Sequence, residues 1–169
     1  MNTALAKSYD LERRGLDFYI SSAVKCGNSV AKRTLFSLAK EEIEHMMKID
    51  EISSVIDKSG GWPDVGFKTS DIEIAIRDFF EKAKPVILKA DKDSAAIIKE
   101  AMEFERKSYD LYSDMEKKGS SSNEKRFYSQ LKHQEEAHYE ALENVHYYLL
   151  KTGDWFGQDE SKVWNWMNL

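Results

Sequence analysis

The sequence predicts an all-α protein, a four-helix bundle made of two helical hairpins joined by one long connection. Its 169 residues are 33% charged and 41% hydrophobic, with two prolines and eight glycines, a mixture typical of long amphipathic helices. Apolar residues recur with helical spacing in four stretches, and the connections between the stretches are short, long and short. A bundle with a single crossover needs this order of connections.

The first two helices form the first hairpin. Residues of the first stretch recur in steps of three and four, at Leu5, Tyr9, Glu12, Leu16, Tyr19 and Ala23. This helix is expected to end at "CGNS", where Gly27 can adopt the left-handed conformation and Asn28 or Ser29 can cap the next helix. The second helix is expected over about 30–56. Its inner stripe comprises Leu35, Leu38, Glu42, His45, Ile49, Ile52 and Ile56.

A long connection over residues 57–93 separates the two hairpins. Three glycines and Pro63 in "DKSGGWPDVGFKT" predict a loop over 57–69. The stretch "SDIE" at 70–73 has the pattern of a capping box, which predicts a short helix that ends before Pro85.

The last two helices form the second hairpin. The third helix is expected over about 94–118, with its stripe at Ile98, Met102, Glu105, Tyr109 and Tyr112. Gly119 should end it, and "SSNE" at 121–124 is a second capping box. The fourth helix should reach about Lys151. Its stripe comprises Tyr128, Leu131, Glu135, His138, Leu142, Val145 and Leu149.

The two hairpins carry the same polar residues at a constant offset of 93 residues. "LERRGLDFY" (11–19) aligns with "FERKSYDLY" (104–112), and "LAKEEIEH" (38–45) aligns with "LKHQEEAH" (131–138). The offset matches Glu12 with Glu105, Tyr19 with Tyr112, Leu38 with Leu131, Glu42 with Glu135, and His45 with His138. The chain is therefore a tandem repeat of two helical hairpins.

A third Glu-x-x-His pair, Glu143 and His146, has no counterpart, because Asp50 and Ser53 stand at the offset positions. We expect that pair to be a surface pair or a helix-end interaction. The two matched pairs differ from it because they fall on inner stripes among Leu and Ile.

Four glutamates on inner stripes predict bound cations. A buried, unpaired carboxylate is strongly destabilising unless it is protonated or neutralised. The nearby basic residues stand beside the stripes: Arg13, Lys40, Arg106 and Lys132. Two divalent metal ions would balance the charge of four glutamates and two neutral histidines. Glu-x-x-His from each of two helices, with a Glu from each of the other two, is the ligand pattern of dinuclear carboxylate sites in helix bundles.

With this order, spacing and repeat, residues 4–150 resemble the rubrerythrin branch of the ferritin-like superfamily. The resemblance implies a ferritin-like bundle whose metal ligands are Glu12, Glu42, His45, Glu105, Glu135 and His138, the four glutamates being catalytic. It implies that Glu42 and Glu135 are bridging or shared carboxylates. It also implies that Tyr19 and Tyr112 contact the ligands, although both could be plain core aromatics. The implied cofactor is two iron ions; the donor set suits iron or manganese and does not itself exclude zinc or cobalt.

The resemblance implies a di-iron oxidoreductase that reduces hydrogen peroxide or dioxygen in oxidative-stress defence. Typical rubrerythrins carry a rubredoxin domain with paired Cys-x-x-Cys motifs, whereas this chain has only Cys26, so electrons would come from a separate donor protein. The typical peroxidase site also has a further Glu where this chain has Ser108, and Gly15 stands at the equivalent position of the first half. These departures leave two alternatives open, a ferroxidase that oxidises ferrous iron and a non-catalytic bundle with structural metal.

Charge and hydropathy exclude other classes of protein. A net charge of −5 and a pI near 5.5 leave no basic stripe for nucleic acid. No apolar run reaches the roughly 18 residues that span a membrane. The N-terminal stretch lacks the apolar core of a signal peptide, and a single cysteine suits a reducing compartment, so the cytoplasm is expected.

The expected domain organisation is a bundle over 1–151, with repeat halves at about 4–56 and 94–151, and a tail over 152–169. The tail holds Trp155, Trp164 and Trp166. We expect it to pack on the bundle or on a second subunit, which favours a homodimer, and docking of the electron donor is the alternative.

Overall fold

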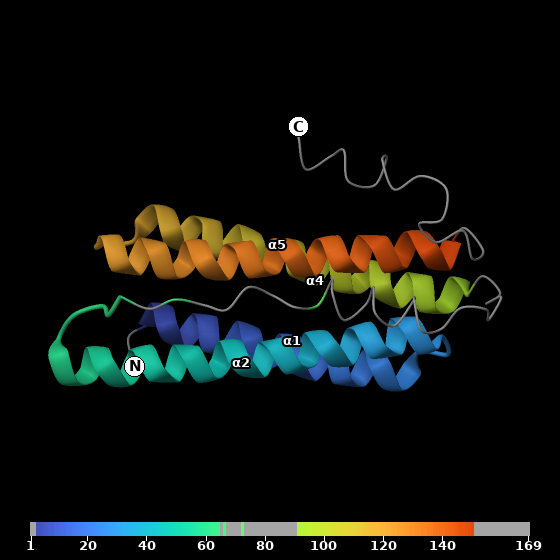
Figure 1. Cartoon of the computed structure of the whole chain (residues 1–169), viewed down its shortest axis with the longest axis horizontal. Helices are drawn as coiled ribbons and strands as arrows, with labels where there is room; N and C mark the ends of the chain where they lie inside the picture. Colours follow the sequence, from blue (N-terminus) through green and yellow to red (C-terminus); the bar gives the residue numbers. More distant parts are fainter. Residues whose placement is uncertain (1–2, 65, 67–71, 73–90, 151–169) are drawn as a thin grey trace.

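The computed structural model describes residues 3–64, 66, 72 and 91–150. This part of the chain contains four α-helices: α1 (Thr3–Lys25), α2 (Ser29–Ser59), α4 (Lys92–Lys118) and α5 (Ser122–Leu150). They form two layers, each a hairpin, with α1 beside α2 and α4 beside α5 (Figure 1). The predicted all-α bundle of two helical hairpins is therefore confirmed.

The turn between α1 and α2 is closed by a side chain rather than by a glycine. The side chain of Asn28 accepts hydrogen bonds from the backbone N–H groups of Val30 and Ala31, at 2.9 and 3.2 Å. The predicted cap at Asn28 is therefore confirmed, because its oxygen satisfies donors that the first helical turn leaves unpaired. The predicted left-handed conformation at Gly27 is wrong, since Gly60 is the glycine with positive φ in the described residues.

Helix α2 is longer than predicted, so the loop predicted over 57–69 is wrong for residues 57–59. The helix ends at Gly60, which has φ 74° and donates its N–H to the carbonyl oxygen of Ile56 at 2.8 Å. The apolar pattern stops at Ile56, the last apolar residue of the inner stripe. The helix itself continues until Gly60 caps it in the left-handed conformation.

The second hairpin has two further caps. Helix α4 starts at Lys92, two residues before the predicted start, because the side chain of Asp91 accepts a hydrogen bond from the N–H of Ser94 at 3.0 Å. At the start of α5, the hydroxyl of Ser121 accepts from the N–H of Glu124 at 3.2 Å. The Glu124 carboxylate accepts from the N–H of Ser120 at 2.7 Å, so the predicted capping box forms with one side shifted by a residue.

Two predictions fall outside the described residues, the end of the last helix at Lys151 and the packing of the tail over 152–169. Of the capping box at 70–73 and its short helix, the structure describes Ile72 alone, which is helical and buried. Within the described residues, no helix is long and apolar enough to cross a membrane.

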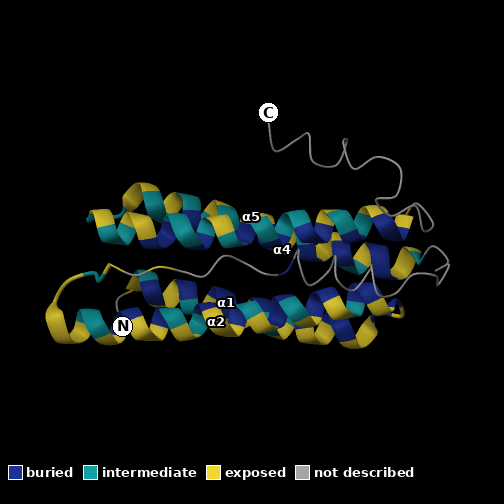
Figure 2. Cartoon of the chain, in the orientation of Figure 1, coloured by how far each residue is buried: buried dark blue, intermediate teal, exposed yellow. Residues whose placement is uncertain are grey.

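The predicted stripes form the interior of the bundle (Figure 2). Their apolar residues gather in two clusters. One cluster packs around Tyr19, Leu35 and Leu142, and the other packs around Tyr112, Tyr128 and Leu131. The buried polar side chains include four glutamates and two histidines, all from the stripes.

Candidate metal centre

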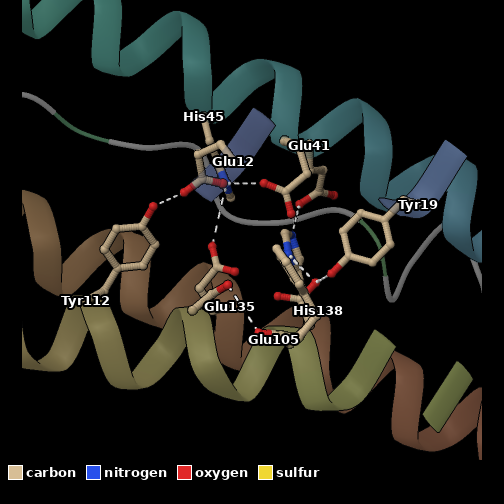
Figure 3. A network of polar contacts seen from close by, with 11 residues as sticks. Glu12, Tyr19, Glu41, His45, Glu105, Tyr112, Glu135 and His138 are labelled. Atoms are coloured by element: carbon tan, nitrogen blue, oxygen red, sulfur yellow. Dashed lines mark hydrogen bonds and ion pairs between the residues drawn. The ribbon is translucent and has the colours of Figure 1, made fainter. Parts of the chain in front are cut away.

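Six side chains from all four helices meet in the interior of the bundle (Figure 3). They are the sequence-predicted ligands Glu12, Glu42, His45, Glu105, Glu135 and His138, and each is at most 3% exposed. Because each helix presents its polar residues on the same stripe as its apolar ones, packing of the stripes brings the six together.

The six residues form two groups that share one carboxylate. Glu12, Glu42 and His45 form the first group, in which one potential ligand atom from each residue lies within 4.8 Å of the others. The second group, by the same measure, consists of Glu42, Glu105, Glu135 and His138. Glu42 stands in both groups, which is the arrangement expected of a shared carboxylate. Its repeat counterpart Glu135 stands in one.

Both histidines turn Nδ1 toward the carboxylates. Nδ1 of His45 lies 3.1 Å from Glu12 Oε2 and 3.6 Å from Glu135 Oε1. Nδ1 of His138 lies 3.4 Å from Glu105 Oε1. The two imidazole rings stack with their centroids 5.5 Å apart. Nδ1 of both histidines thus faces the carboxylate cluster.

Each hairpin supplies a tyrosine to a glutamate of the other hairpin. The hydroxyl of Tyr19 on α1 donates to Glu105 Oε1 on α4, and the hydroxyl of Tyr112 on α4 donates to Glu12 Oε1 on α1. The two rings lie on opposite sides of the carboxylate cluster (Figure 3). Both tyrosines are fully buried, so these bonds fix the orientation of the two carboxylates.

Sequence analysis missed Glu41. Its Oε2 lies 2.9 Å from Nε2 of His138, the nitrogen that faces away from the cluster, and its side chain is 14% exposed. A carboxylate on the outer nitrogen of a metal-binding histidine fixes its tautomer and its ring orientation. The repeat could not reveal this residue, because Gln134 stands at the equivalent position. The one hint in the sequence was that Glu41 directly precedes the predicted ligand Glu42.

Several buried polar atoms of the cluster have no hydrogen-bond partner: both carboxylate oxygens of Glu42 and of Glu135, Oε2 of Glu105 and Nδ1 of His138. Atoms of this kind are costly to bury, since each loses its bonds to water without replacement. All of them belong to the six sequence-predicted ligands, and they face one another. The residues present therefore fit bound cations.

The carboxylates of the cluster have pKa values shifted in opposite directions. Burial raises the pKa of Glu42 well above its usual value, and the negative charge of Glu12 adds to the shift. Burial and the charge of Glu105 raise the pKa of Glu135 in the same way. Burial opposes ionisation of Glu12 too, but its interactions with Glu42 and His45 lower its pKa to about 2. Neighbouring carboxylates thus divide into protonated and ionised members.

The histidine and the tyrosines respond to the same carboxylates. Burial by itself would lower the pKa of His138, but Glu105 and Glu41 raise it to about 10. Burial and the adjacent glutamates raise the pKa of Tyr19 and of Tyr112 well above the usual value, so both phenols keep the protons that they donate.

Gly15 lies against the cluster, and another small residue, Ser108, stands at the equivalent repeat position. A Cβ atom added to Gly15 would lie 3.0 Å from Glu42 Oε1 and 3.1 Å from Phe104 Cε1, so the glycine leaves room for the shared carboxylate. Ser108 is buried, and its hydroxyl donates to the backbone carbonyl of Phe104 at 3.2 Å. The third Glu-x-x-His pair lies outside both groups, with Glu143 exposed and His146 half-buried.

The fold and the site together define a class: a helix bundle with a buried carboxylate and histidine cluster compatible with metal binding. The family model for Rubrerythrin matches residues 3–146. The chain therefore belongs to the rubrerythrin family, and its bundle is ferritin-like, as the sequence predicts. Comparisons with curated proteins and with solved structures gave no significant match.

Proposed function

We propose that this chain is a di-iron oxidoreductase that reduces hydrogen peroxide or dioxygen with electrons from a separate donor. The observation that supports it best is the set of buried carboxylate oxygens without hydrogen-bond partners on Glu42 and Glu135, which lie 3.7 and 3.6 Å from His45 Nδ1. Family membership supports iron as the metal.

Each repeat would hold one metal ion. Glu12 and His45 would bind the first ion, Glu105 and His138 would bind the second, and Glu42 and Glu135 would be shared. When bound, two adjacent iron ions supply one electron each to an O–O bond. The side chains around the two ions would orient the ligands, keep protons near them and exclude bulk water.

Three features of the chain serve the reaction. The Tyr19 and Tyr112 hydroxyls hold the outer ligand carboxylates in position and keep protons beside them. Glu41 holds the ring of His138. The apolar clusters on both sides exclude bulk water, which strengthens each electrostatic interaction inside the site.

Metal content is the first test. We expect about two iron ions per chain in protein purified without chelators, the number that a dinuclear site of this kind holds. Glu42→Ala combined with Glu135→Ala should remove most of that iron. Glu143→Ala, which changes an exposed glutamate of the unmatched motif, is the matched control and should keep it. A folded wild type without bound metal would contradict the proposal.

Stopped-flow measurements then separate the reactions. Reduced, iron-loaded protein is mixed with peroxide or with dioxygen, and its oxidation is followed with and without a reductant. Repeated turnover that needs the reductant supports the proposal. Turnover that needs only added ferrous iron would identify a ferroxidase, and tightly bound zinc without redox activity would identify a structural site.

A further inference from the structure

We propose that Trp62, Tyr128 and Tyr112 form a path for single electrons between the protein surface and the candidate metal centre. The side chains of Trp and Tyr are the ones most readily oxidised by one electron without a cofactor. These three lie in ring contact in the order surface, interior, site. The proposal deepens the proposed function, on which its physiological role rests.

The inner end of the path is Tyr112, whose hydroxyl donates to the predicted ligand Glu12. The Tyr112 ring is fully buried and stacks on the Tyr128 ring, with centroids 6.3 Å apart and an interplanar angle of 17°. Tyr128 is 1% exposed, and its ring meets the indole of Trp62 at 5.8 Å in an edge contact. Trp62 is half-buried, so its indole reaches solvent.

Trp62 is held in place although it follows the end of α2. The side-chain amide of Asn123 donates to its backbone carbonyl at 2.9 Å. Two residues on, Asp64 pairs with Arg126 at 2.7 Å. The indole also contacts the Phe127 ring at 5.6 Å. Contacts with a single helix, α5, therefore fix the indole against Tyr128.

The other tyrosine of the site has no such route among the described ring contacts. Tyr19 meets the rings of Phe18 and Phe104, at 5.4 and 5.9 Å. Phenylalanine is far harder to oxidise than tyrosine or tryptophan, so neither ring accepts a radical. The repeat offset places Leu35 at the position of Tyr128. The path is thus confined to one side of the molecule, and the repeat does not account for it.

The hydrogen bonds indicate where the protons go. Once peroxide or dioxygen had oxidised the iron-loaded site, the Tyr112 phenol would lose one electron to that site and its proton to Glu12 Oε1. The reductant at the surface drives the return step: an electron passes from Trp62 to the phenol, the proton returns from Glu12, and the Trp62 radical is reduced before it can oxidise Tyr112 again. The indole proton of oxidised Trp62 passes to solvent. A soluble one-electron reductant such as ascorbate, together with a solvent proton, restores Trp62.

Tyr128 acts as the bridge between the two ends. The polar group beside its hydroxyl is the hydroxyl of Ser8, a far weaker proton acceptor than the Glu12 carboxylate that Tyr112 contacts. A radical should therefore settle at Tyr112, which has the stronger acceptor, rather than at Tyr128.

Pulse radiolysis of the metal-free protein tests the path without any iron chemistry. Trp155, Trp164 and Trp166 are replaced by Phe in the full-length chain, so that Trp62 is the sole indole. Azide radicals then oxidise Trp62. We expect the tryptophan radical to decay in a fast phase that is independent of protein concentration, while a tyrosyl radical appears with the same rate constant.

Three variants locate the path. Tyr128→Leu, which copies the other half of the repeat, should lose the fast phase. Tyr112→Phe keeps the ring and should lose the tyrosyl product. Tyr19→Phe changes the equivalent tyrosine on the other side and should alter neither. A fast phase and a tyrosyl product that survive in both Tyr128→Leu and Tyr112→Phe would overturn the proposal.

The iron-loaded protein separates this proposal from the proposed function. After peroxide is added without reductant, a tyrosyl radical should persist at Tyr112, and Tyr112→Phe should abolish it; added ascorbate should remove this radical quickly in the wild type and slowly in Tyr128→Leu. If peroxide is consumed but the metal-free chain shows no fast phase, the path is overturned and the proposed function stands. If the fast phase is present and the loaded chain consumes neither peroxide nor dioxygen, the proposed function fails and the path stands.

Discussion

The two helical hairpins supply the same ligand types to the site but surround them differently. The predicted ligands of the first hairpin are Glu12, Glu42 and His45, and their counterparts in the second are Glu105, Glu135 and His138. In each hairpin, one tyrosine donates a hydrogen bond to a glutamate of the other hairpin. The neighbouring positions do not repeat. The repeat thus covers the six predicted ligands in pairs, whereas the residues around them differ between the two sides.

Three pairs of positions carry the difference. Glu41, which contacts His138, corresponds to Gln134. Gly15, which leaves room for Glu42, corresponds to Ser108. Tyr128, which links Tyr112 to the surface, corresponds to Leu35. A centre with symmetric ligands thus lies in an asymmetric protein, and substitutions at paired positions should have unequal effects.

The largest expected inequality is between the two shared glutamates. Glu42 belongs to both ligand groups and Glu135 to one. Glu42→Ala should therefore remove nearly all bound iron, whereas Glu135→Ala should keep the ion held by Glu12, Glu42 and His45. Iron per chain after desalting measures the difference, with helical content by circular dichroism as the folding control. Equal losses would show that the two carboxylates are equivalent.

Loss of the Glu41 carboxylate should weaken metal binding by about 10- to 100-fold, the usual effect of removing a carboxylate that orients a ligating histidine. The change is Glu41→Ala, and chelator competition measures the affinity. Glu41→Asp should restore part of it. Glu44→Ala is the control on the same helix, because Glu44 is exposed and pairs with Lys40 at 3.4 Å. An affinity loss as large in Glu44→Ala would refute a specific role for Glu41.

The stability of the metal-free protein should fall as pH rises from about 6.5 to about 10. The pKa of His138 is raised from 6.5 to about 10 by Glu105 and Glu41, so its contribution is complete below the lower value and is lost through the upper one. The raised pKa values of Glu42 and Glu135 also make the stability fall as pH rises. The lowered pKa of Glu12 affects stability only at acid pH. The stability that ionised Glu12 contributes is lost as pH falls from 4.5 toward about 2.

Urea unfolding of the chelator-treated protein across this pH range measures the trend. His138→Gln should flatten it. The exposed His133→Gln should leave it unchanged. Bound metal should remove the trend, since the cations displace the protons from the same carboxylates. A metal-free protein that gains stability from pH 6.5 to pH 10 would contradict this assignment of protons.

The smallest difference is expected between the substitutions Gly15→Ala and Ser108→Ala. Gly15→Ala gains up to about 1 kcal/mol of helix propensity, but the new methyl group would crowd Glu42 Oε1 at 3.0 Å and weaken metal binding. Ser108→Ala loses one hydrogen bond, worth about 1 kcal/mol, to a helix carbonyl and should leave metal affinity unchanged. Urea unfolding and chelator competition give the two quantities. Unchanged metal affinity in Gly15→Ala would show that the crowding is relieved without moving Glu42.

Much of the fold could be predicted from sequence because burial in a bundle imposes one spacing on apolar and ligating residues alike. The glutamates stand where Leu or Ile would otherwise stand, and the repeat separates the two matched motifs from Glu143 and His146. Helix ends were less predictable. Asp91 caps α4 two residues before the expected start, and Asn28 rather than Gly27 closes the first turn, since both depend on local side-chain geometry.

The asymmetric parts of the site were beyond sequence analysis for a physical reason. Glu41 stands beside the inner stripe of its own helix and reaches His138 only because α5 packs against α2. Trp62 stands in a predicted loop, and its contact with Tyr128 joins segments far apart in the chain. Such contacts follow from tertiary packing, which neither periodicity nor repetition encodes.

The burial of the six ligands governs how fast metal can enter and leave. None of them is more than 3% exposed, so a chelator cannot reach a bound ion while the bundle is closed. Release must wait for the hairpins to separate locally, and its rate is then set by that opening. At saturating chelator, the rate of metal loss becomes independent of chelator concentration. An ion in the proposed site would consequently exchange only as fast as the hairpins open, however tightly or weakly the ligands bind it.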